Sequence, residues 1–591
     1  MAVVGIDLGT TNTVVACVRD GQVQVLPDEQ GRPLLPSVVS FHPSGEVLVG
    51  YLAKDRRVVD AKNTIASVKR LIGRGWNSDE IRRGRPRFAF ELKEGPGGGP
   101  VVVARGQSYS LPEISAFVLK RARAIAERAL GEKVDRAVIT VPANFNELQR
   151  AATQVAAKIA GLDVLRVINE PTAAALAYGV AQGARERIVV YDFGGGTFDC
   201  TLLELSGNVF EVLATAGDSF LGGDDLDLAV AERMAEAFLR SNRYDPKADA
   251  QSFERLRVAA ESLKIELSRE ERRHVRLADI AFGVGGARLD LDFELTRSEL
   301  EALANPLIER TLAVCQDAMA EARQPVSAID RVILVGGSTR IPLVRKRVEQ
   351  FFGISPLDRV NPDEVVAVGA AIQAAALAGT APWRSIPSPP TPAYGAPTQP
   401  SLPDFDDDEL SDDEITIATP TEALVAPNGR GASDLVNRAP AAEGAAPILS
   451  RGVVPVLVDV TPRALVVETV GGWCDVLVKR NAKIPCERTR AFATSSDMQT
   501  VVKVRVAQGE DPLFAQNTYL GEVELSELRP APRGQVTIQV RFEVDESGTL
   551  EVAATEGSTG RKARARLKLV GISAHQTIEQ MKERHDAASM R

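Results

Sequence analysis

Apolar and polar positions follow two different periods along the first 380 residues. Short apolar runs such as Val3–Ile6 and Ile188–Tyr191 are typical of buried strands, whereas Glu113 to Leu130 repeats apolar residues at the spacing of a helix. A mixture of buried strands and amphipathic helices predicts an α/β fold for this part of the chain.

Two segments of this region resemble each other. Residues 5–12 read GIDLGTTN and residues 190–197 read VYDFGGGT, and each is followed by a further strand-like run. Both carry an apolar strand, an aspartate and a turn of small residues. A turn without bulky side chains lets backbone N–H groups approach phosphate oxygens, and the aspartate suits a hydrated divalent cation. The pair predicts two hairpins that hold one nucleotide from both sides.

A third glycine motif, VILVGGSTR at residues 332–340, places glycines directly after a buried strand. Glycines at that position permit close approach to a flat adenosine. The chain has no Gly-x4-Gly-Lys-Ser/Thr and no complete Gly-x-Gly-x-x-Gly, which disfavours P-loop and dinucleotide-binding folds.

Residues 459–570 alternate apolar and polar positions. Val536 to Val544 has one apolar face, and Glu546–Gly548 turns the chain toward Leu550, which predicts a hairpin in an antiparallel sandwich. Residues 381–450 differ from both regions, since they carry 11 acidic and 3 basic residues and 12 of the 34 prolines. Such a composition predicts a disordered insert between two folded regions.

Composition excludes several function classes. Aromatic residues make up only 5% of the 591 residues, fewer than single-stranded nucleic-acid platforms use. The five cysteines and four histidines show no metal-ligand or disulfide spacing. Without a long apolar run or a signal-like N-terminus, we expect a cytoplasmic protein that binds neither membrane nor nucleic acid.

The three motifs, in this order, resemble the superfamily of actin, the sugar kinases and heat-shock protein 70. Five further strings narrow the resemblance to the heat-shock protein 70 (DnaK) family: SVKRLIG at 67–73, ITVPA at 139–143, INEPTAAALAYG at 168–179, LGGDDLD at 221–227 and NPDE at 361–364.

This resemblance implies a domain order for the whole chain. It predicts an α/β actin-like (ribonuclease-H-like, duplicated) ATPase domain at 1–380, a disordered acidic insert at 381–451 and a hydrophobic linker at 452–458. An antiparallel β-sandwich that binds peptides is expected at 459–570, and a vestigial helical lid or tail at 571–591.

The resemblance also implies a nucleotide site for ATP or ADP with Mg²⁺, and K⁺ is plausible. Lys69 would orient the attacking water, and Asp7, Glu170, Asp192, Asp199 and Thr197 would complete the catalytic set, with Asp7 and Asp192 holding Mg²⁺ mostly through water. The phosphates and adenosine would be bound by Gly9, Thr10, Thr11, Asn12, Gly194, Gly195, Gly196, Thr197, Gly222, Gly223, Glu261, Lys264, Ser268, Gly336, Gly337, Ser338, Arg340 and Asp363.

Positions that match the family's interdomain relay are Pro142, Arg150, Arg166, Leu457 and Asp459, and Arg166 also matches a contact for J-domain partners. Those that match the peptide channel are Leu465, Val467, Val470, Phe492, Ser495, Val502 and Val504. The chain departs from the family at Pro455, where we expect weaker linker docking, and at Val466, Trp473 and Cys474, which alter the channel. About 20 residues follow Val570, so we expect a short lid and fast peptide release.

The resemblance therefore predicts a monomeric, slow ATPase that works as a molecular chaperone on extended polypeptides, with a J-domain protein and a nucleotide-exchange factor as partners. An alternative is an ATP-binding scaffold or co-chaperone-like protein that cycles weakly on peptides. A small-molecule kinase of the same superfamily is disfavoured, because the C-terminal sandwich matches no sugar site.

Overall fold

The computed structural model describes residues 2–179, 185–357, 361–379, 455–564, 578–588 and 590. By their contacts, residues 1–384 and 446–591 form one unit, and the other unit, 385–445, lies outside the described residues. The predicted disordered insert and residues 452–454 of the predicted linker therefore also lie outside the described residues.

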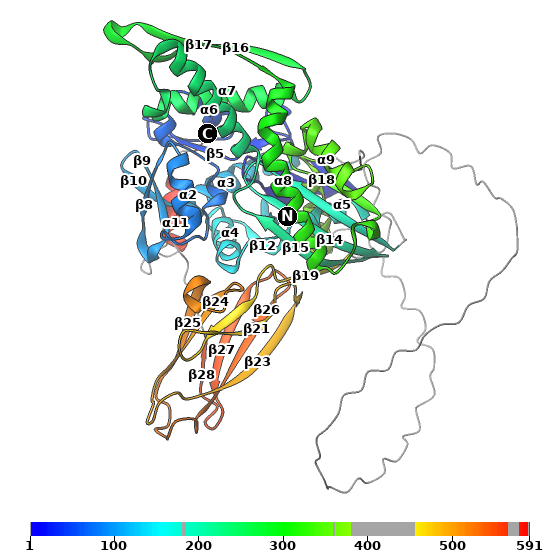
Figure 1. Cartoon of the computed structure of the whole chain (residues 1–591). Helices are drawn as coiled ribbons and strands as arrows, with labels where there is room; N and C mark the ends of the chain where they lie inside the picture. The colour runs from blue at the N-terminus through cyan, green and yellow to red at the C-terminus, as the bar shows by residue number, and fades with distance from the viewer. Residues whose placement is uncertain are drawn as a thin grey trace, which may run out of the picture. The chain divides into compact units, whose positions relative to one another are not determined.

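Two large sheets that share a pattern of four strands, β11-β1-β2-β3 and β18-β13-β14-β15, form the framework of the N-terminal region (Figure 1). The first consists of β1 (Ala2–Leu8), β2 (Asn12–Arg19), β3 (Gln22–Val25), β4 (Leu35–Pro36), β11 (Val134–Val141) and β12 (Asp163–Asn169). The second consists of β13 (Glu186–Phe193), β14 (Phe198–Ser206), β15 (Val209–Asp218), β18 (Arg331–Val335), β19 (Val456–Val460) and β22 (Lys483–Ile484).

The two sheets repeat one pattern of pairing. In the first, β1 pairs antiparallel with β2 and parallel with β11. In the second, β13 pairs antiparallel with β14 and parallel with β18. The two hairpins predicted from the sequence are β1–β2 and β13–β14, so the repeated motif marks a repeated fold.

Helices cover both faces of these sheets. The pair α5 (Glu170–Gly179) and α10 (Val365–Ala378) contacts strands of both sheets, and its core cluster contains Val138 and Val190. The first sheet is covered by α3 (Leu111–Leu130) and α4 (Glu147–Ile159), and the second by α8 (Arg297–Glu321), α6 (Gly223–Asn242), α7 (Ala250–Leu267) and α9 (Pro342–Phe352). We call residues 2–179 the first lobe and 185–379 the second lobe.

Local sequence explains where the longer helices begin and end. Helix α3 begins with a capping box, in which Ser110 and Glu113 satisfy each other's backbone groups, and ends at Gly131 with φ 72°. Thr296 and Glu299 form the same box at the start of α8.

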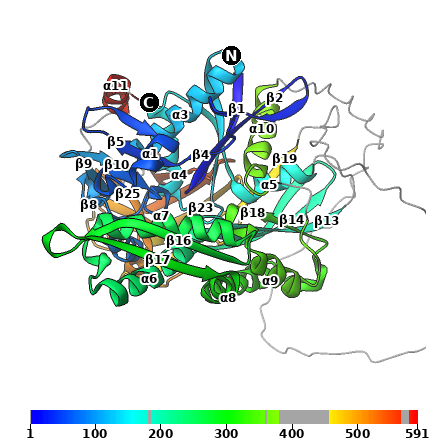
Figure 2. The same cartoon turned by 90° about the horizontal axis from the view of Figure 1, so that it is seen from above.

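Smaller elements decorate the two lobes. The first lobe carries two three-stranded sheets and two short helices. One sheet contains β5 (Val38–Phe41), β6 (Val47–Val49) and β7 (Thr64–Ala66), and the other contains β8 (Glu91–Glu94), β9 (Pro100–Ala104) and β10 (Gln107–Ser110). The helices are α1 (Tyr51–Arg56) and α2 (Asp79–Gly84). The second lobe carries the long hairpin β16 (Arg272–Phe282) and β17 (Arg288–Thr296), which lies along α6 and α7 (Figure 2).

Residues 465–564 form two four-stranded antiparallel sheets around one core. One contains β20 (Leu465–Glu468), β21 (Cys474–Val478), β24 (Val502–Gln508) and β25 (Thr518–Leu525). The other contains β23 (Cys486–Ala493), β26 (Thr537–Val544), β27 (Leu550–Glu556) and β28 (Lys562–Arg564). The predicted hairpin is β26–β27, and Gly548 at its turn has φ 74°. The expected fold class, α/β followed by an antiparallel sandwich, is confirmed.

One more helix, α11 (Ile578–Ala587), follows the sandwich in sequence. Of the described helices, none has the length and apolar character to cross a membrane.

Candidate functional site

The two predicted phosphate loops face each other across a cleft of about 600 Å³. From the first lobe the cleft is lined by Asp7, Gly9, Thr10, Thr11, Asn12, Lys69 and Glu170, and from the second by Asp192, Gly194, Gly195, Thr197, Gly336, Gly337 and Asp363. The structure thus brings together residues that are up to 356 positions apart in the sequence.

Glycines let the two loops come into contact. A Cβ atom on Gly195 would lie 1.8 Å from Oγ1 of Thr11, and one on Gly196 would lie 2.4 Å from Cγ2 of Thr10. Behind them, a Cβ on Gly222 would lie 2.3 Å from the carbonyl oxygen of Gly195. Because these distances are far below van der Waals contact, only glycine fits, and backbone N–H groups stay accessible to phosphate oxygens.

Lys69 lies at the centre of a buried acidic cluster. Its Nζ atom donates to Oε1 of Glu170 at 2.5 Å and to the carbonyl oxygen of Leu8. Lys69 follows Ser67, whose φ of 57° is left-handed, so the backbone turns sharply just before the lysine. An ammonium group has three donors, and these two bonds leave one for a water or a phosphate oxygen.

Three aspartates surround this ion pair. Burial raises the pKa of Asp7 to about 7, with a further rise from Glu170 and a counteracting effect of Lys69. Burial, followed by the charge of Glu170, also raises the pKa of Asp192 and of Asp199 well above its usual range. Asp199 does not line the cleft; it accepts from the backbone N–H of Asn144 at 3.2 Å, and its Oδ2 atom is buried without a partner.

The four carboxyl groups disfavour one another's ionisation, and a divalent cation bound beside them would stabilise their ionised forms. Among the described residues, no three His, Cys, Asp or Glu side chains converge closely enough to coordinate a metal directly. This donor set fits Mg²⁺, which keeps several waters and is held by one or two carboxylates together with phosphate oxygens.

The residues expected to bind adenosine gather around the loop after β18. Ser338 donates to the carbonyl oxygen of Gly194 at 2.9 Å, and Lys264 binds Asp227 at 2.8 Å. Arg340 forms an ion pair with Asp363 at 2.6 Å. Ser268 only caps the end of α7, where its hydroxyl donates to the carbonyl oxygen of Lys264, and it has no contact with the cleft lining.

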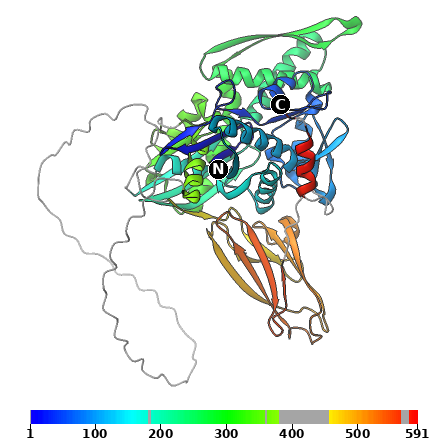
Figure 3. The ribbon, with the colours of Figure 1, turned by 180° about the vertical axis from the view of Figure 1, so that it is seen from behind.

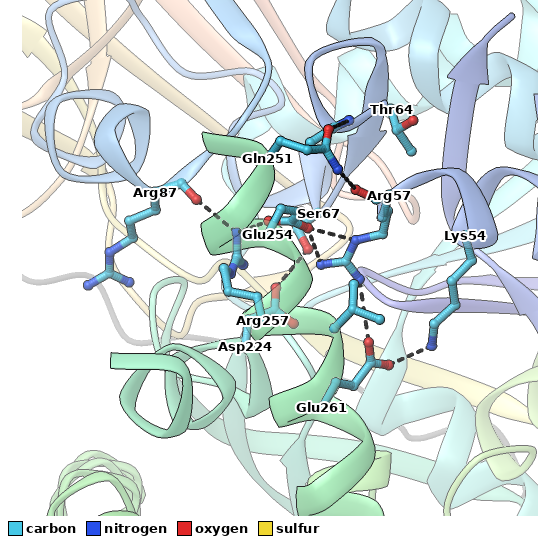
Figure 4. Close-up of polar contacts among 12 residues, drawn as sticks. Lys54, Arg57, Thr64, Ser67, Arg87, Asp224, Gln251, Glu254, Arg257 and Glu261 are labelled. Carbon is cyan, nitrogen blue, oxygen red and sulfur yellow. Dashed lines mark hydrogen bonds and ion pairs between the residues drawn. The ribbon is translucent and has the colours of Figure 1, made fainter. Parts of the chain in front are cut away.

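The sequence reasoning missed a set of ion pairs that joins the two lobes beside this cleft (Figure 4). Arg57, next to α1, binds Glu254 of α7 at 2.6 Å and Glu261 at 3.4 Å. Lys54 binds Glu261 at 2.7 Å, and within α7 Arg257 binds Glu254 at 3.1 Å.

Lys54, Arg57, Arg257 and Glu261 line a second pocket that shares Thr10 and Thr11 with the first. Burial opposes ionisation of Glu261, but Lys54 and Arg57 lower its pKa below the usual value. No sequence signal indicated the pairs, because partners about 200 residues apart share no motif. Glu261, predicted as an adenosine contact, is therefore also a bridge between the lobes.

Two of the residues predicted to link the folded regions, Arg150 and Asp459, are joined through the side chain of Asn169. Asn169, directly before Glu170, donates to Oδ1 of Asp459 at 2.8 Å, and Thr172 donates to its Oδ2 at 3.3 Å. Arg150 binds the side chain of Asn169 and the carbonyl oxygen of Ser547. Burial raises the pKa of Asp459, although Arg150 and these donors lower it.

Strand β19 extends the second sheet. It pairs parallel with β15 from Val456 onward, and Leu457 is buried in the core between the sheets. The N–H of Val456 donates to the carbonyl oxygen of Asn208 at 2.8 Å. The pairing with β15 begins at Val456, directly after Pro455. The N–H group that Pro455 lacks would therefore not belong to the hydrogen bonds of this strand pair, and these bonds show no sign of the weaker linker docking that we expected.

Two other predicted interdomain residues contact different groups. Arg166 is buried and donates to the carbonyl oxygen of Glu546 at 3.0 Å, so its guanidinium is engaged by the β26–β27 turn. The carbonyl oxygen of Pro142 accepts from the N–H of Phe145 at the entry to α4.

The predicted peptide-channel residues divide into two groups. Leu465, Val467 and Val504 belong to the sandwich core, with Phe492 and Val502 packed at its edge. Val470 is 74% exposed, and Ser495 is also exposed. The neighbouring Trp473 is 55% exposed, and its loop pairs with the loop at Leu513. The structure thus brings five of the seven together.

A comparison with known protein families agrees with this architecture. The sequence model of the Hsp70 protein family matches residues 3–386 and 441–591. The match covers both the nucleotide cleft and the β-sandwich. The chain therefore belongs to the Hsp70 family, whose members bind nucleotide and act as ATP-dependent chaperones.

Proposed function

We propose that this chain hydrolyses ATP slowly and uses the reaction to control the affinity of its β-sandwich for extended apolar polypeptides. The observation that carries the proposal is the run of contacts from Lys69 through Glu170 and Asn169 to Asp459. It connects the cleft to strand β19, and so a change at the γ-phosphate has a short path to the sandwich.

In this mechanism the chain's own residues position the reactants. Lys69 orients the attacking water with its remaining donor and stabilises charge on the phosphoryl group, because phosphoryl transfer depends mainly on positioning and electrostatics. The glycine loops supply backbone donors to the phosphates. Asp7 and Asp192 would hold Mg²⁺ through water, and the cation would neutralise phosphate charge when bound. Asp199 and Glu170 keep Lys69 in place.

Coupling to peptide binding is proposed to work through Asp459. With ATP bound, β19 stays paired with β15 and the sandwich stays docked through Arg150 and Arg166. Hydrolysis would shift Glu170 and Asn169, weaken their hold on Asp459 and release the sandwich. A J-domain protein is the expected stimulator, and release of β19 or of Arg166 from Glu546 is the expected point of its action.

Steady-state ATP hydrolysis tests this proposal directly. The rate is measured with a J-domain protein and an unstructured apolar peptide, separately and together. We expect stimulation of the wild-type chain, and loss of that stimulation in Asp459→Ala with the basal rate retained. Glu524→Ala, which alters an exposed carboxylate of the sandwich, is the matched control. Absence of stimulation in the wild type would overturn the proposal.

The second candidate is an ATP-binding scaffold with little peptide cycling. It is favoured by one observation, that the helix after the sandwich packs on α3 of the first lobe. If this candidate holds, the wild type binds ATP tightly but shows no peptide-dependent change in hydrolysis.

A further inference from the structure

The C-terminal helix α11 is built into the hydrophobic core of the first lobe. Met581 is 0% exposed and belongs to the same cluster as the strands β1 and β11 and helix α3. Ile578, Ala588 and Met590 pack against this cluster, and Met590 forms a parallel bridge with Val47 of β6. Figure 3 shows α11, in red, beside the blue elements of this lobe.

His585 extends an aromatic cluster of the first lobe. Its ring is 1% exposed and stacks on Phe117 with 3.9 Å between centroids. Phe117 in turn meets Phe41 and Tyr109 edge-on. Burial, reinforced by Lys120 and Arg584, lowers the pKa of His585 to about 3, so the ring is neutral at pH 7.

Ion pairs surround this apolar contact. Arg584 binds the carboxylate of Glu113, which also caps α3, and lies over the ring of Tyr109 at 4.8 Å. Lys120 donates to the carbonyl oxygen of His585 at 2.9 Å and to Oδ1 of Asp586 at 2.8 Å. The helix is thus held on both sides of its buried face.

These contacts are separate from the nucleotide cleft. Val47, Tyr109, Glu113, Phe117 and Lys120, which contact α11, do not line the cleft, and α11 also packs against α4. A ligand shifts an equilibrium only by its differential interaction with the two states. Release of α11 would expose the side chains of Met581 and His585, which are at most 1% exposed, and a nucleotide in the cleft would have to offset that cost.

We propose that α11 is a permanent structural element of the first lobe, which anchors the far end of the β-sandwich in every nucleotide state instead of opening and closing over it. At the other end of the sandwich, β19 is paired with β15. The 13 residues between Arg564 and Ile578 span at most about 45 Å when fully extended. The sandwich is thus tethered at both ends, and its excursions stay within that reach even after β19 is released.

Hydrogen exchange of the full-length chain, read by mass spectrometry, tests this inference. The chain is compared without nucleotide, with ADP and with ATP, all in the presence of Mg²⁺. We expect the amides of residues 578–587 to exchange as slowly as those of α3, to the same extent in all three states. Loss of protection without nucleotide or with ADP would show a nucleotide-controlled lid and overturn the proposal.

Two variants of α11 compare a buried position with an exposed one. Met581→Glu places a charge in the core, and we expect it to remove protection from α11 in all three states. Glu583→Gln changes an exposed residue and should leave exchange unchanged. If Met581→Glu unfolds the first lobe, Arg584→Gln gives the milder test, with partial loss of protection at α11. A chain that binds ATP without hydrolysing it would fail the proposed function but still give the expected exchange pattern.

Discussion

The residues predicted for the nucleotide cleft and those predicted for the peptide channel of the β-sandwich differ in polarity and in burial. In the cleft the residues are polar, and Lys69 is buried and fixed by Glu170. In the sandwich, Leu465 and Val467 are at most 1% exposed and belong to the core, whereas Val470 is 74% exposed. The predicted cleft residues are therefore polar groups supported by other residues, whereas Leu465 and Val467 are themselves part of the hydrophobic core of the sandwich.

This difference has a practical meaning for mutagenesis. A substitution in the cleft should change activity more than stability. A substitution of a channel residue in the sandwich should change stability first, and only the exposed positions should report on peptide binding alone.

The largest effect is expected in the sandwich core. Leu465→Ala should lower the free energy of unfolding of the sandwich by about 2–5 kcal/mol, because it leaves a cavity in a fully buried position. Val470→Ala should change it by less than about 0.5 kcal/mol. Chemical denaturation followed by the fluorescence of Trp473, in a chain with Trp76 and Trp383 replaced by Phe, measures both changes. Equal losses would erase the distinction between core and exposed channel residues.

Lys69→Ala should come next. Removing the donor that orients water should slow hydrolysis about 10²–10³-fold in single-turnover experiments, while the chain stays folded and binds ATP. Lys158→Ala, on the exposed face of α4, is the control and should keep the wild-type rate. An unchanged rate in Lys69→Ala would mean that the proposed mechanism is wrong.

Gly222→Ala tests the packing of the start of α6 behind the second phosphate loop. The added Cβ would lie 2.3 Å from the carbonyl oxygen of Gly195, and such overpacking costs about 1–3 kcal/mol. We expect about a 10–100-fold loss of ATP affinity by calorimetry. Gly75→Ala, whose Cβ meets nothing closer than 3.9 Å, should bind ATP normally.

The smallest effect concerns the boundary between the two regions. Glu147 is buried where α4 meets the sandwich, and its N–H donates to Gln508. Burial raises the pKa of Glu147 from 4.5 to about 7; Arg150 of its own helix lowers it, Asp545 of the sandwich raises it, and the N–H of Leu550 lowers it. Because docking raises the pKa of Glu147, the protonated acid favours the docked sandwich. This stabilisation of docking is complete below pH 4.5 and is lost as pH rises through 7.

We expect docking to weaken about tenfold between pH 6 and pH 8. Hydrogen exchange at residues 545–550, corrected for intrinsic rates, measures the change. Glu147→Gln should remove the pH dependence and Glu543→Gln, an exposed control, should keep it. A pH response that persists in Glu147→Gln would assign it to another group.

Much of this molecule could be predicted from the sequence because its signals are local. Each phosphate hairpin is an apolar strand, an aspartate and small residues in one short segment, and the caps of α3 and α8 are four-residue patterns. The alternation along 536–552 likewise predicted β26 and β27. Such features are formed by residues that are close together in the sequence, so a short sequence pattern is enough to predict them.

Other features depend on partners that are distant in the chain. Arg57 reaches Glu254 and Glu261 from almost 200 residues away, and nothing in the composition of α1 indicates this bridge. The cluster that raises the pKa of Asp7 exists only because folding buries Asp7, Glu170, Asp192 and Asp199 together. The sequence by itself determined the two hairpins and the sandwich, since these follow from local spacing and side-chain size, whereas the roles of the site residues are predictions from the family resemblance. Only the tertiary structure decided which lysine faces which carboxylate, how β19 joins the second sheet, and that α11 packs into the first lobe, because those contacts arise when distant segments exclude water together.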